Sequence, residues 1–240
     1  MLTDHTQQII LPDAELIFIP NFWKGAEADD LFQILKNELA WQQSAIKIFG
    51  KLINEPRLTA WYGNEGKVYT YSGKTQIPNS WHPTLLDIKN KIENIPEVSA
   101  KYNSVLCNLY RNGNDSMGWH SDDEKELGQN PIIASVNFGE TRRFLFRHKN
   151  DKSLKHELSL THGSLLIMSG TMQHYWQHAV PKEPKRTGAR INLTFRKILN
   201  KETILEKQNA ANFKGLLIAK EAVAYHAHLK KARSEWDRDI

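Results

Sequence analysis

Two histidines and one aspartate in this chain have residue types and a spacing that could hold a metal ion. His120 and Asp122 stand two positions apart, and His178 follows 178 − 120 = 58 residues later. Positions i and i+2 of an extended segment project to the same side, so the first two side chains can converge. Two imidazoles and one carboxylate form the facial set that binds Fe(II) and leaves neighbouring coordination positions open. By itself, the spacing also fits a loop aspartate beside a histidine, with an unrelated surface histidine elsewhere.

The segment 190–196, Arg-Ile-Asn-Leu-Thr-Phe-Arg, strengthens the metal hypothesis because polar and apolar residues alternate along it. On a strand the two sets face opposite sides. If Arg190 and Arg196 lie on an interior wall, they require an anion, and the guanidinium fork suits a carboxylate. We therefore predict that Arg190, Asn192 and Arg196 bind a dicarboxylate, as in a 2-oxoglutarate-dependent oxygenase. An exposed edge strand with its basic residues in water is the competing interpretation.

Two further residues fit the same cosubstrate site, and two alternatives stay open. Asn108 and Tyr110 share a face of the predicted strand just upstream of His120 and could bond a carboxylate. An Asn at a strand end and a Tyr with one wet edge would look the same. Zinc is an alternative metal, although a zinc hydrolase would not need paired interior arginines. His174 is the rival for the third ligand position.

Aromatic residues upstream of the triad suggest contacts to a flat substrate. Tyr69 and Tyr71 can share one side of a strand and stack against an extruded base, or they can form an ordinary cross-strand pair in a hairpin. Phe49 stands on a predicted turn, where it could act as a wedge between base steps or pack on the core. A group of basic residues could contact phosphates or cover a solvated surface; it comprises Arg142, Arg143, Arg147, His148, Lys149, Lys182, Lys185 and Arg186.

Composition limits the class of protein. The 240 residues suffice for one sizeable domain, and 40% hydrophobic and 25% charged residues are ordinary for a globular protein. No apolar run approaches a membrane span, and the first residues lack the features of a signal peptide. Cys107 is the single cysteine, which fits a reducing cytoplasm. A net charge of +5 and a sequence pI of about 9.1 are compatible with nucleic acid without indicating it.

The hydrophobic pattern predicts helices ahead of a series of strands, which indicates an α+β or helix-supported β architecture. We expect a hairpin or loop at 56–73 and an extended segment at 45–49. The last forty residues, 201–240, are rich in Ala, Lys and Glu and predict one or two helices. Helices are expected at 26–39 and 83–95, and strands at 15–19, 104–110, 132–138, 142–147, 155–160, 164–168 and 190–196.

Taken together, these segments resemble the AlkB family of nucleic-acid dealkylating dioxygenases over about residues 40 to 198. The resemblance is closest to the branch that repairs duplex DNA, through Phe-Gly-Lys at 49–51, Tyr-Thr-Tyr-Ser-Gly at 69–73 and His-Ser-Asp-Asp-Glu at 120–124. The other matching segments are Asn-Leu-Tyr-Arg-Asn-Gly at 108–113, Ile-Ala-Ser-Val-Asn-Phe-Gly at 133–139, Phe-Leu-Phe-Arg-His-Lys at 144–149, His-Gly-Ser-Leu-Leu-Ile-Met at 162–168 and the strand 190–196.

The resemblance implies a fold and a set of residue roles. The fold would be a double-stranded β-helix (jelly-roll) core with supporting N-terminal helices, forming a dioxygenase domain over 1–200 with a nucleotide-recognition lid at 45–75. A helical extension over 201–240 has no counterpart in the family. Fe(II) would be held by His120, Asp122 and His178, and 2-oxoglutarate by Asn108, Tyr110, Arg190, Asn192 and Arg196. The substrate would be contacted by Tyr69, Tyr71, Glu124, Phe49 and Arg57, with Tyr71 standing where the branch often has Phe.

The implied reaction is oxidative demethylation of 1-methyladenine and 3-methylcytosine in DNA, with O₂ as oxidant and formaldehyde, succinate and CO₂ as products. The DNA could be duplex or single-stranded, and the chain is expected to be monomeric and without a membrane partner. It would lie in a bacterial cytoplasm, or in the nucleus of a eukaryote. Alternatives are the same chemistry on RNA or another substrate, and a non-catalytic damage-binding protein. The fold alone does not choose among them.

Overall fold

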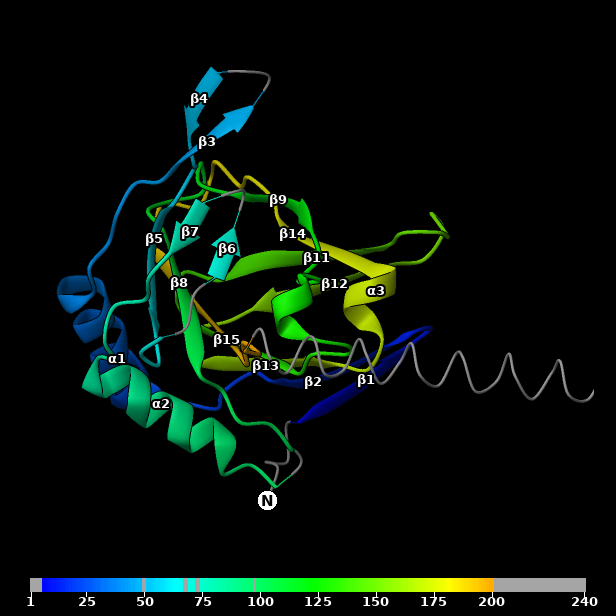
Figure 1. Ribbon diagram of the computed structural model, residues 1–240, viewed down its shortest axis with the longest axis horizontal. Helices are drawn as coiled ribbons and strands as arrows, with labels where there is room; N and C mark the ends of the chain where they lie inside the picture. The colour runs from blue at the N-terminus through cyan, green and yellow to red at the C-terminus, as the bar shows by residue number, and fades with distance from the viewer. Residues whose placement is uncertain (1–5, 49–50, 67–68, 72–73, 97, 201–240) are drawn as a thin grey trace, which may run out of the picture. The chain divides into compact units, whose positions relative to one another are not determined.

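The computed structural model describes residues 6–48, 51–66, 69–71, 74–96 and 98–200 (Figure 1). For 46–48, 51, 69–71 and 74–76 the backbone is described without the side chains. The chain divides into two units, Met1–Ile198 and Leu199–Ile240. The helical extension predicted for 201–240 lies outside the described residues.

The largest element is an antiparallel seven-stranded sheet, shown through the middle of Figure 1. The strand 190–196 lies near its centre, with a neighbour on each side. Every residue of that strand is buried, which rules out the interpretation of an exposed edge strand. In sheet order the strands are β1 (Gln7–Leu11), β2 (Ala14–Ile19), β13 (Ser164–Ser169), β10 (Ile133–Gly139), β15 (Arg190–Arg196), β8 (Ser104–Tyr110) and β5 (Leu58–Gly63).

A second antiparallel sheet of four strands packs against the first. Phe144 and Phe146 from this sheet share a buried cluster with Leu16 and Leu166 of the larger sheet. Two antiparallel sheets packed in this way form an α+β fold of the jelly-roll type. In sheet order the strands are β12 (Lys155–Leu160), β11 (Arg142–His148), β14 (Trp176–Val180) and β9 (Met117–His120), so that β9 is an edge strand.

Two helices cover the outer face of the large sheet, as Figure 1 shows at the lower left. In helix α2 (Pro83–Glu93), Leu85, Ile88 and Ile92 recur at helical spacing and are buried, and His82 caps the first turn by accepting a hydrogen bond from the backbone N–H of Thr84 at 3.3 Å. Helix α1 (Gly25–Glu38) buries Ala28 and Leu35 in the same cluster. The apolar side chains of β15 pack in this cluster, so its polar side chains face the space between the sheets.

Two small hairpins occupy the predicted lid region. They are β3 (Ala45–Ile48) with β4 (Lys51–Asn54), and β6 (Tyr69–Tyr71) with β7 (Lys74–Gln76). Figure 1 shows β3 and β4 projecting at one end of the described unit. The prediction of a hairpin or loop for 56–73 was wrong at 58–63, because β5 pairs with β8 as the last strand of the large sheet. Its aromatic and glycine content resembled a turn, but pairing with β8 decided its conformation.

Several short elements were not predicted. These are β1, β4, β7, β9, β14, the short helix α3 (Met172–Tyr175) and the 3₁₀ turn η1 (Lys125–Leu127). In β9 the sequence Met-Gly-Trp-His has no clear alternation, and β14 contains both polar and apolar residues. Pairing between strands distant in sequence, rather than local propensity, forms them. Within the described residues, no helix is long and apolar enough to cross a membrane.

Candidate active site

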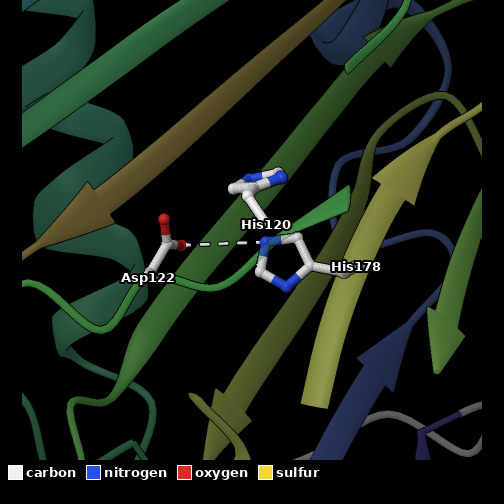
Figure 2. A group of neighbouring side chains, drawn as sticks. All are labelled: His120, Asp122 and His178. Carbon is white, nitrogen blue, oxygen red and sulfur yellow. Dashed lines mark ion pairs between the residues drawn. The ribbon is translucent and has the colours of Figure 1, made fainter. Parts of the chain in front are cut away.

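The three candidate metal ligands come from two neighbouring strands and the loop after one of them (Figure 2). His120 ends β9 and lies directly opposite His178 of β14 in the antiparallel register. Asp122 follows in the loop after β9. Between His178 and Val180 the register shifts, as in a β-bulge, and such irregularities commonly re-aim side chains at functional sites. The pairing of β9 with β14 therefore closes the 58-residue gap between the two histidines.

The three side chains converge on one point. One possible ligand atom from each of His120, Asp122 and His178 lies within 4.8 Å of the others. Nε2 of His178 is 4.0 Å from Oδ2 of Asp122, and the two imidazole rings are 4.3 Å apart between centroids. Within the described part of the chain, no other group of three His, Cys, Asp or Glu side chains converges in this way. The rival His174 instead lies 3.0 Å from Oδ1 of Asn130.

The protonation states suit a metal site. Burial, followed by the charge of His120, lowers the pKa of His178 to about 3, so its imidazole is neutral at pH 7. Burial alone would raise the pKa of Asp122, but the charge of Arg196 leads a set of interactions that outweigh burial and lower it. A neutral imidazole and an ionised carboxylate are the forms that bind metal ions.

Neighbouring groups hold the ligands in position. The backbone N–H of Asp122 donates to Oε1 of the buried Gln173 at 2.9 Å, and the hydroxyl of Ser121 donates to the carbonyl of Trp176 at 2.8 Å. Nδ1 of His120 lies 2.9 Å from the carbonyl oxygen of Gly118, which leaves Nε2 for a ligand. Sequence reasoning missed Gln173, since its only sequence signal is its position five residues before His178.

The five residues predicted to bind the cosubstrate line the same cavity as the three candidate ligands. Across β8 and β15, Tyr110 pairs with Arg190 and Asn108 pairs with Asn192, so these side chains form two adjacent rows. The fifth, Arg196, lies at the far end of β15 and donates from Nη2 to Oδ1 of Asp122 at 2.6 Å. The predicted alternation of β15 thus places its polar side chains in the cavity.

Arg190 shows that this wall fits an anion. The side chain is 1% exposed, its guanidinium lies 5.0 Å from the ring centroid of Tyr110, and Nη2 donates to Oδ1 of Asn137 at 2.5 Å. Its Nε and Nη1 are buried and have no hydrogen-bond partner within the described structure. Burial lowers the pKa of Arg190 to about 10, which still leaves it charged at pH 7. A carboxylate would satisfy both the charge and the two unpaired donors.

Arg57 connects the lid region to the cosubstrate wall. It lies between β4 and β5, is 3% exposed, and lines the cavity. Its Nε donates to Oδ1 of Asn108 at 2.8 Å, and its Nη2 donates to Oε1 of the buried Glu55 at 3.1 Å. Arg57, predicted to contact substrate, is therefore already engaged by two side chains, one of which is a predicted cosubstrate ligand.

The other predicted substrate residues are described less fully. Tyr69 and Tyr71 lie on β6, but their side chains are outside the described part of the structure, and so is the whole of Phe49. Glu124 stands just before η1. Its Oε2 is buried without a hydrogen-bond partner in the described structure, and Glu124 is not among the residues that line the cavity.

Two of the predicted phosphate contacts are wrong. Arg142 is 1% exposed and donates to Glu183 and to the backbone carbonyls of Asn112, Asp115 and Pro181, so it joins loops inside the protein. His148 is 8% exposed and packs on Trp176. The alternation along β11 explains why Arg142 and His148 are buried, since positions 142, 144, 146 and 148 face the core and 143 and 147 are exposed.

Comparison with known proteins agrees with this geometry. Residues 15–196 match the family model described as the 2OG-Fe(II) oxygenase superfamily. The chain is 47% identical over 188 residues to alpha-ketoglutarate-dependent dioxygenase alkB homolog 3 of Bos taurus, covering 75% of this chain and 64% of that protein. It is 41% identical over 184 residues to DNA oxidative demethylase ALKBH2 of Homo sapiens, covering 72% of this chain and 70% of that protein.

The fold has a counterpart among solved structures. The structure of OsALKBH1 matches with a TM-score of 0.54 at 16% identity, covering 80% of this chain and all of that one. At that identity the match supports the fold alone. The chain spans 64% of the length of the bovine and human alkB homolog 3 proteins that it matches. On the family model and on these relatives, the chain belongs to the AlkB family of 2-oxoglutarate- and Fe(II)-dependent oxygenases.

Proposed function

We propose that this protein removes N-linked methyl groups from alkylated bases of nucleic acid by oxidation. The observation that carries the proposal is a single buried cavity with two functions. The cavity is lined by the three convergent side chains of His120, Asp122 and His178. It is also lined by Arg190, which presents two unpaired donors to an anion. The relatives named as DNA oxidative demethylases and alpha-ketoglutarate-dependent dioxygenases support this choice of reaction.

The donor set fits the family's metal, Fe(II), and its cosubstrate, 2-oxoglutarate. His120, Asp122 and His178 would hold the metal through two imidazole nitrogens and one carboxylate oxygen. Fe(II) and 2-oxoglutarate, bound together with O₂, would supply the oxidation of the N-methyl carbon, coupled to conversion of 2-oxoglutarate into succinate and CO₂. Because the methyl carbon leaves as formaldehyde, the nitrogen of the base regains its unmodified state. The protein itself supplies binding, orientation and the exclusion of water.

The cavity wall would bind the dicarboxylate through residues of β8 and β15. Arg190 would take one carboxylate with its free Nε and Nη1, while Tyr110 stays against its guanidinium. Asn108, Asn192 and Arg196 would bond the remaining oxygens from the same wall. Since Arg196 also bonds Asp122, binding of the dicarboxylate would be coupled to the orientation of a metal ligand.

Substrate recognition would come from the lid and from the loop after Asp122. We expect Tyr69 and Tyr71 to stack on the extruded base, Phe49 to fill the gap that it leaves, and Arg57 to contact the substrate from the cavity wall that it lines. 1-Methyladenine and 3-methylcytosine carry a positive charge, and a buried carboxylate oxygen of Glu124 without a partner in the described structure would favour such bases. DNA is the proposed substrate, with the same reaction on RNA as the alternative.

The wider organisation is proposed on the same basis. The dioxygenase domain would span 1–200, with the lid over 45–75 and a helical extension over 201–240. The core would be a double-stranded β-helix, a reading that the two packed antiparallel sheets support. We propose that the protein acts as a monomer, in the cytoplasm of a bacterium or the nucleus of a eukaryote.

The test is formaldehyde release from DNA that contains 1-methyladenine, with Fe(II), ascorbate and 2-oxoglutarate each omitted in turn. We expect release that requires both Fe(II) and 2-oxoglutarate and is absent in Asp122→Ala. Consumption of 2-oxoglutarate without formaldehyde would keep the oxygenase and reject this substrate. If neither occurs, a damage-binding protein becomes the better interpretation. Equal turnover of methylated single-stranded RNA would remove the preference for DNA.

A further inference from the structure

An exposed tryptophan and an arginine stack on each other outside the active-site cavity. Trp119 of β9 is 38% exposed, and the guanidinium carbon of Arg147 on β11 lies 4.3 Å from the centroid of its ring. Nε of Arg147 donates to Oε1 of Gln177 on β14 at 2.9 Å, which holds the guanidinium in place. The pair is therefore built from three adjacent strands rather than from one mobile side chain.

This pair lies next to the active site, on the other side of one strand. Trp119 immediately precedes the candidate metal ligand His120. Its partner Arg147 stands between two buried residues of β11, so both side chains are on the outer face of the four-stranded sheet. Because β9 is the edge strand of that sheet, Trp119 lies at the border of the sheet, one residue from the cavity-lining His120.

The charge of Arg147 is not compensated by a neighbouring carboxylate within the described structure. Two other cations near this face are paired, Arg143 with Glu157 at 2.7 Å and Lys149 with Asp123 at 3.0 Å, whereas the exposed Lys155, opposite Arg147 on β12, has no carboxylate partner within the described structure. Arg147 bonds only a neutral amide and the indole ring among the described residues. The face near β9 thus offers an exposed aromatic ring beside a free positive charge.

A purely structural role accounts poorly for this arrangement. A cation–π contact at an exposed site is worth only about 0.5–1 kcal/mol. Tryptophan side chains are highly buried on average, whereas Trp119 is 38% exposed, so part of its ring is open to a ligand. Stacking of a nucleobase on an aromatic ring is worth about 1–3 kcal/mol, and a nearby arginine adds attraction for phosphate. The combination matches the chemistry of a single nucleotide.

We propose that Trp119 and Arg147 form a binding site for the nucleotide next to the target base in the substrate strand. The exposed face of the indole stacks on the flanking base, and the guanidinium of Arg147 binds a phosphate. This inference rests on the proposed function and adds a contact outside the cavity. It predicts that the pair matters for a strand and matters less for an isolated nucleotide.

The experiment compares two substrates in the full-length protein. One is a single-stranded DNA oligonucleotide with one 1-methyladenine, and the other is 1-methyl-2′-deoxyadenosine monophosphate. For Trp119→Ala we expect the ratio of kcat/KM for the oligonucleotide to kcat/KM for the mononucleotide to fall roughly 5- to 150-fold, mainly through KM. Trp119→Phe should restore most of the ratio, because a phenyl ring still stacks.

Two arginines on the same strand give a matched control. Arg147→Gln should lower the ratio, whereas Arg143→Gln should not, because the charge of Arg143 is already paired with Glu157. Thermal melting of each variant identifies any that fail to fold. If Trp119→Ala does not fold, Trp119→Phe and Arg147→Gln still test the site. Wild-type ratios in both Trp119→Ala and Arg147→Gln would overturn the proposal.

A separate readout distinguishes this site from the proposed reaction. If the wild-type protein demethylates neither substrate, the proposed function fails, and binding of the same oligonucleotide is then measured by fluorescence anisotropy. Weaker binding by Trp119→Ala and Arg147→Gln, with Arg143→Gln unchanged, would keep the nucleotide site without the reaction. Equal binding by all four proteins would reject the site as well.

Discussion

Arg196 donates from Nη2 to Oδ1 of Asp122 across 2.6 Å, which links the wall predicted to bind the dicarboxylate to the predicted metal site. Asp122 is 3% exposed and Arg196 is 8% exposed, so the pair is shielded from water. A buried ion pair depends on both members, since removing one leaves the other charge without its partner in a region of low polarity. The two halves of the site are therefore coupled before either ligand binds.

Replacing the carboxylate should affect both metal binding and stability. In Asp122→Asn we expect the affinity for Mn(II), a redox-stable probe of the site, to fall by at least about tenfold, because one anionic ligand is lost. Removing one partner of a buried ion pair should also cost about 3–5 kcal/mol of unfolding free energy. Calorimetric titration with Mn(II) and urea unfolding measure the two effects.

The neighbouring acid is the control for that variant. Asp123 is half exposed and pairs with Lys149 at the surface, so Asp123→Asn should leave Mn(II) affinity near wild type and change stability by less than about 1 kcal/mol. Wild-type Mn(II) affinity in Asp122→Asn would show that the aspartate is not a ligand.

Loss of the buried guanidinium should weaken cosubstrate binding. In Arg190→Gln we expect the Kd for 2-oxoglutarate to rise roughly 30- to 5000-fold, the equivalent of about 2–5 kcal/mol for a desolvated charge pair. The measurement is displacement or calorimetry with Mn(II)-loaded protein. Arg143→Gln removes an arginine that is half exposed and already paired, and should bind as wild type does. A rise of similar size in both variants would count against a specific role of Arg190.

A substitution at Asn137 tests whether the uncompensated charge of Arg190 is needed to bind 2-oxoglutarate. Its Oδ1 accepts from Nη2 of Arg190 at 2.5 Å and from Nδ2 of Asn192 at 3.2 Å. In Asn137→Asp the new carboxylate would neutralise Arg190, so we expect at least about tenfold weaker 2-oxoglutarate binding with retained or raised melting temperature. The exposed Asn150→Asp should change neither quantity. Unaltered 2-oxoglutarate affinity in Asn137→Asp would show that the free charge of Arg190 is not what binds the cosubstrate.

The loop before β9 should show a defined pH dependence of stability. Burial alone would raise the pKa of Asp115. Hydrogen bonds from the Arg111 side chain and backbone, together with the charge of Arg142, outweigh burial, so the pKa is lower than usual. A folded pKa below the unfolded value means that the stabilisation is complete above about pH 4 and is lost as pH falls through the folded pKa. Asp115→Asn should therefore lose about 1–3 kcal/mol at pH 7.

Urea unfolding of Asp115→Asn and wild type from pH 7 to pH 2 measures this dependence. The difference in unfolding free energy should shrink as the pH falls, since the protonated wild-type side chain no longer pairs with Arg111. The exposed Asp30→Asn should stay near wild type throughout. A difference that stays constant over the whole range would mean that ionisation of Asp115 does not contribute.

The sequence alone determined which face of a strand carries the polar and charged side chains of the site. Alternation along 190–196 separated the side chains that line the cavity from those that pack under α1 and α2, because side-chain direction on a strand follows from position alone. The helices at Gly25–Glu38 and Pro83–Glu93 lie within two residues of the predicted ranges, since their apolar spacing and the proline of the second are local signals.

Only the tertiary structure decided which strands pair and which side chains come together. His178 lies opposite His120 only because β14 pairs with β9, and neither strand has a local pattern that predicts it. The same dependence explains β5, which was expected as a hairpin or loop, and Arg142, which satisfies carbonyls of loops distant in sequence. Strand pairing and burial are properties of contacts between remote segments, so they depend on the assembled core rather than on the residues of any one segment.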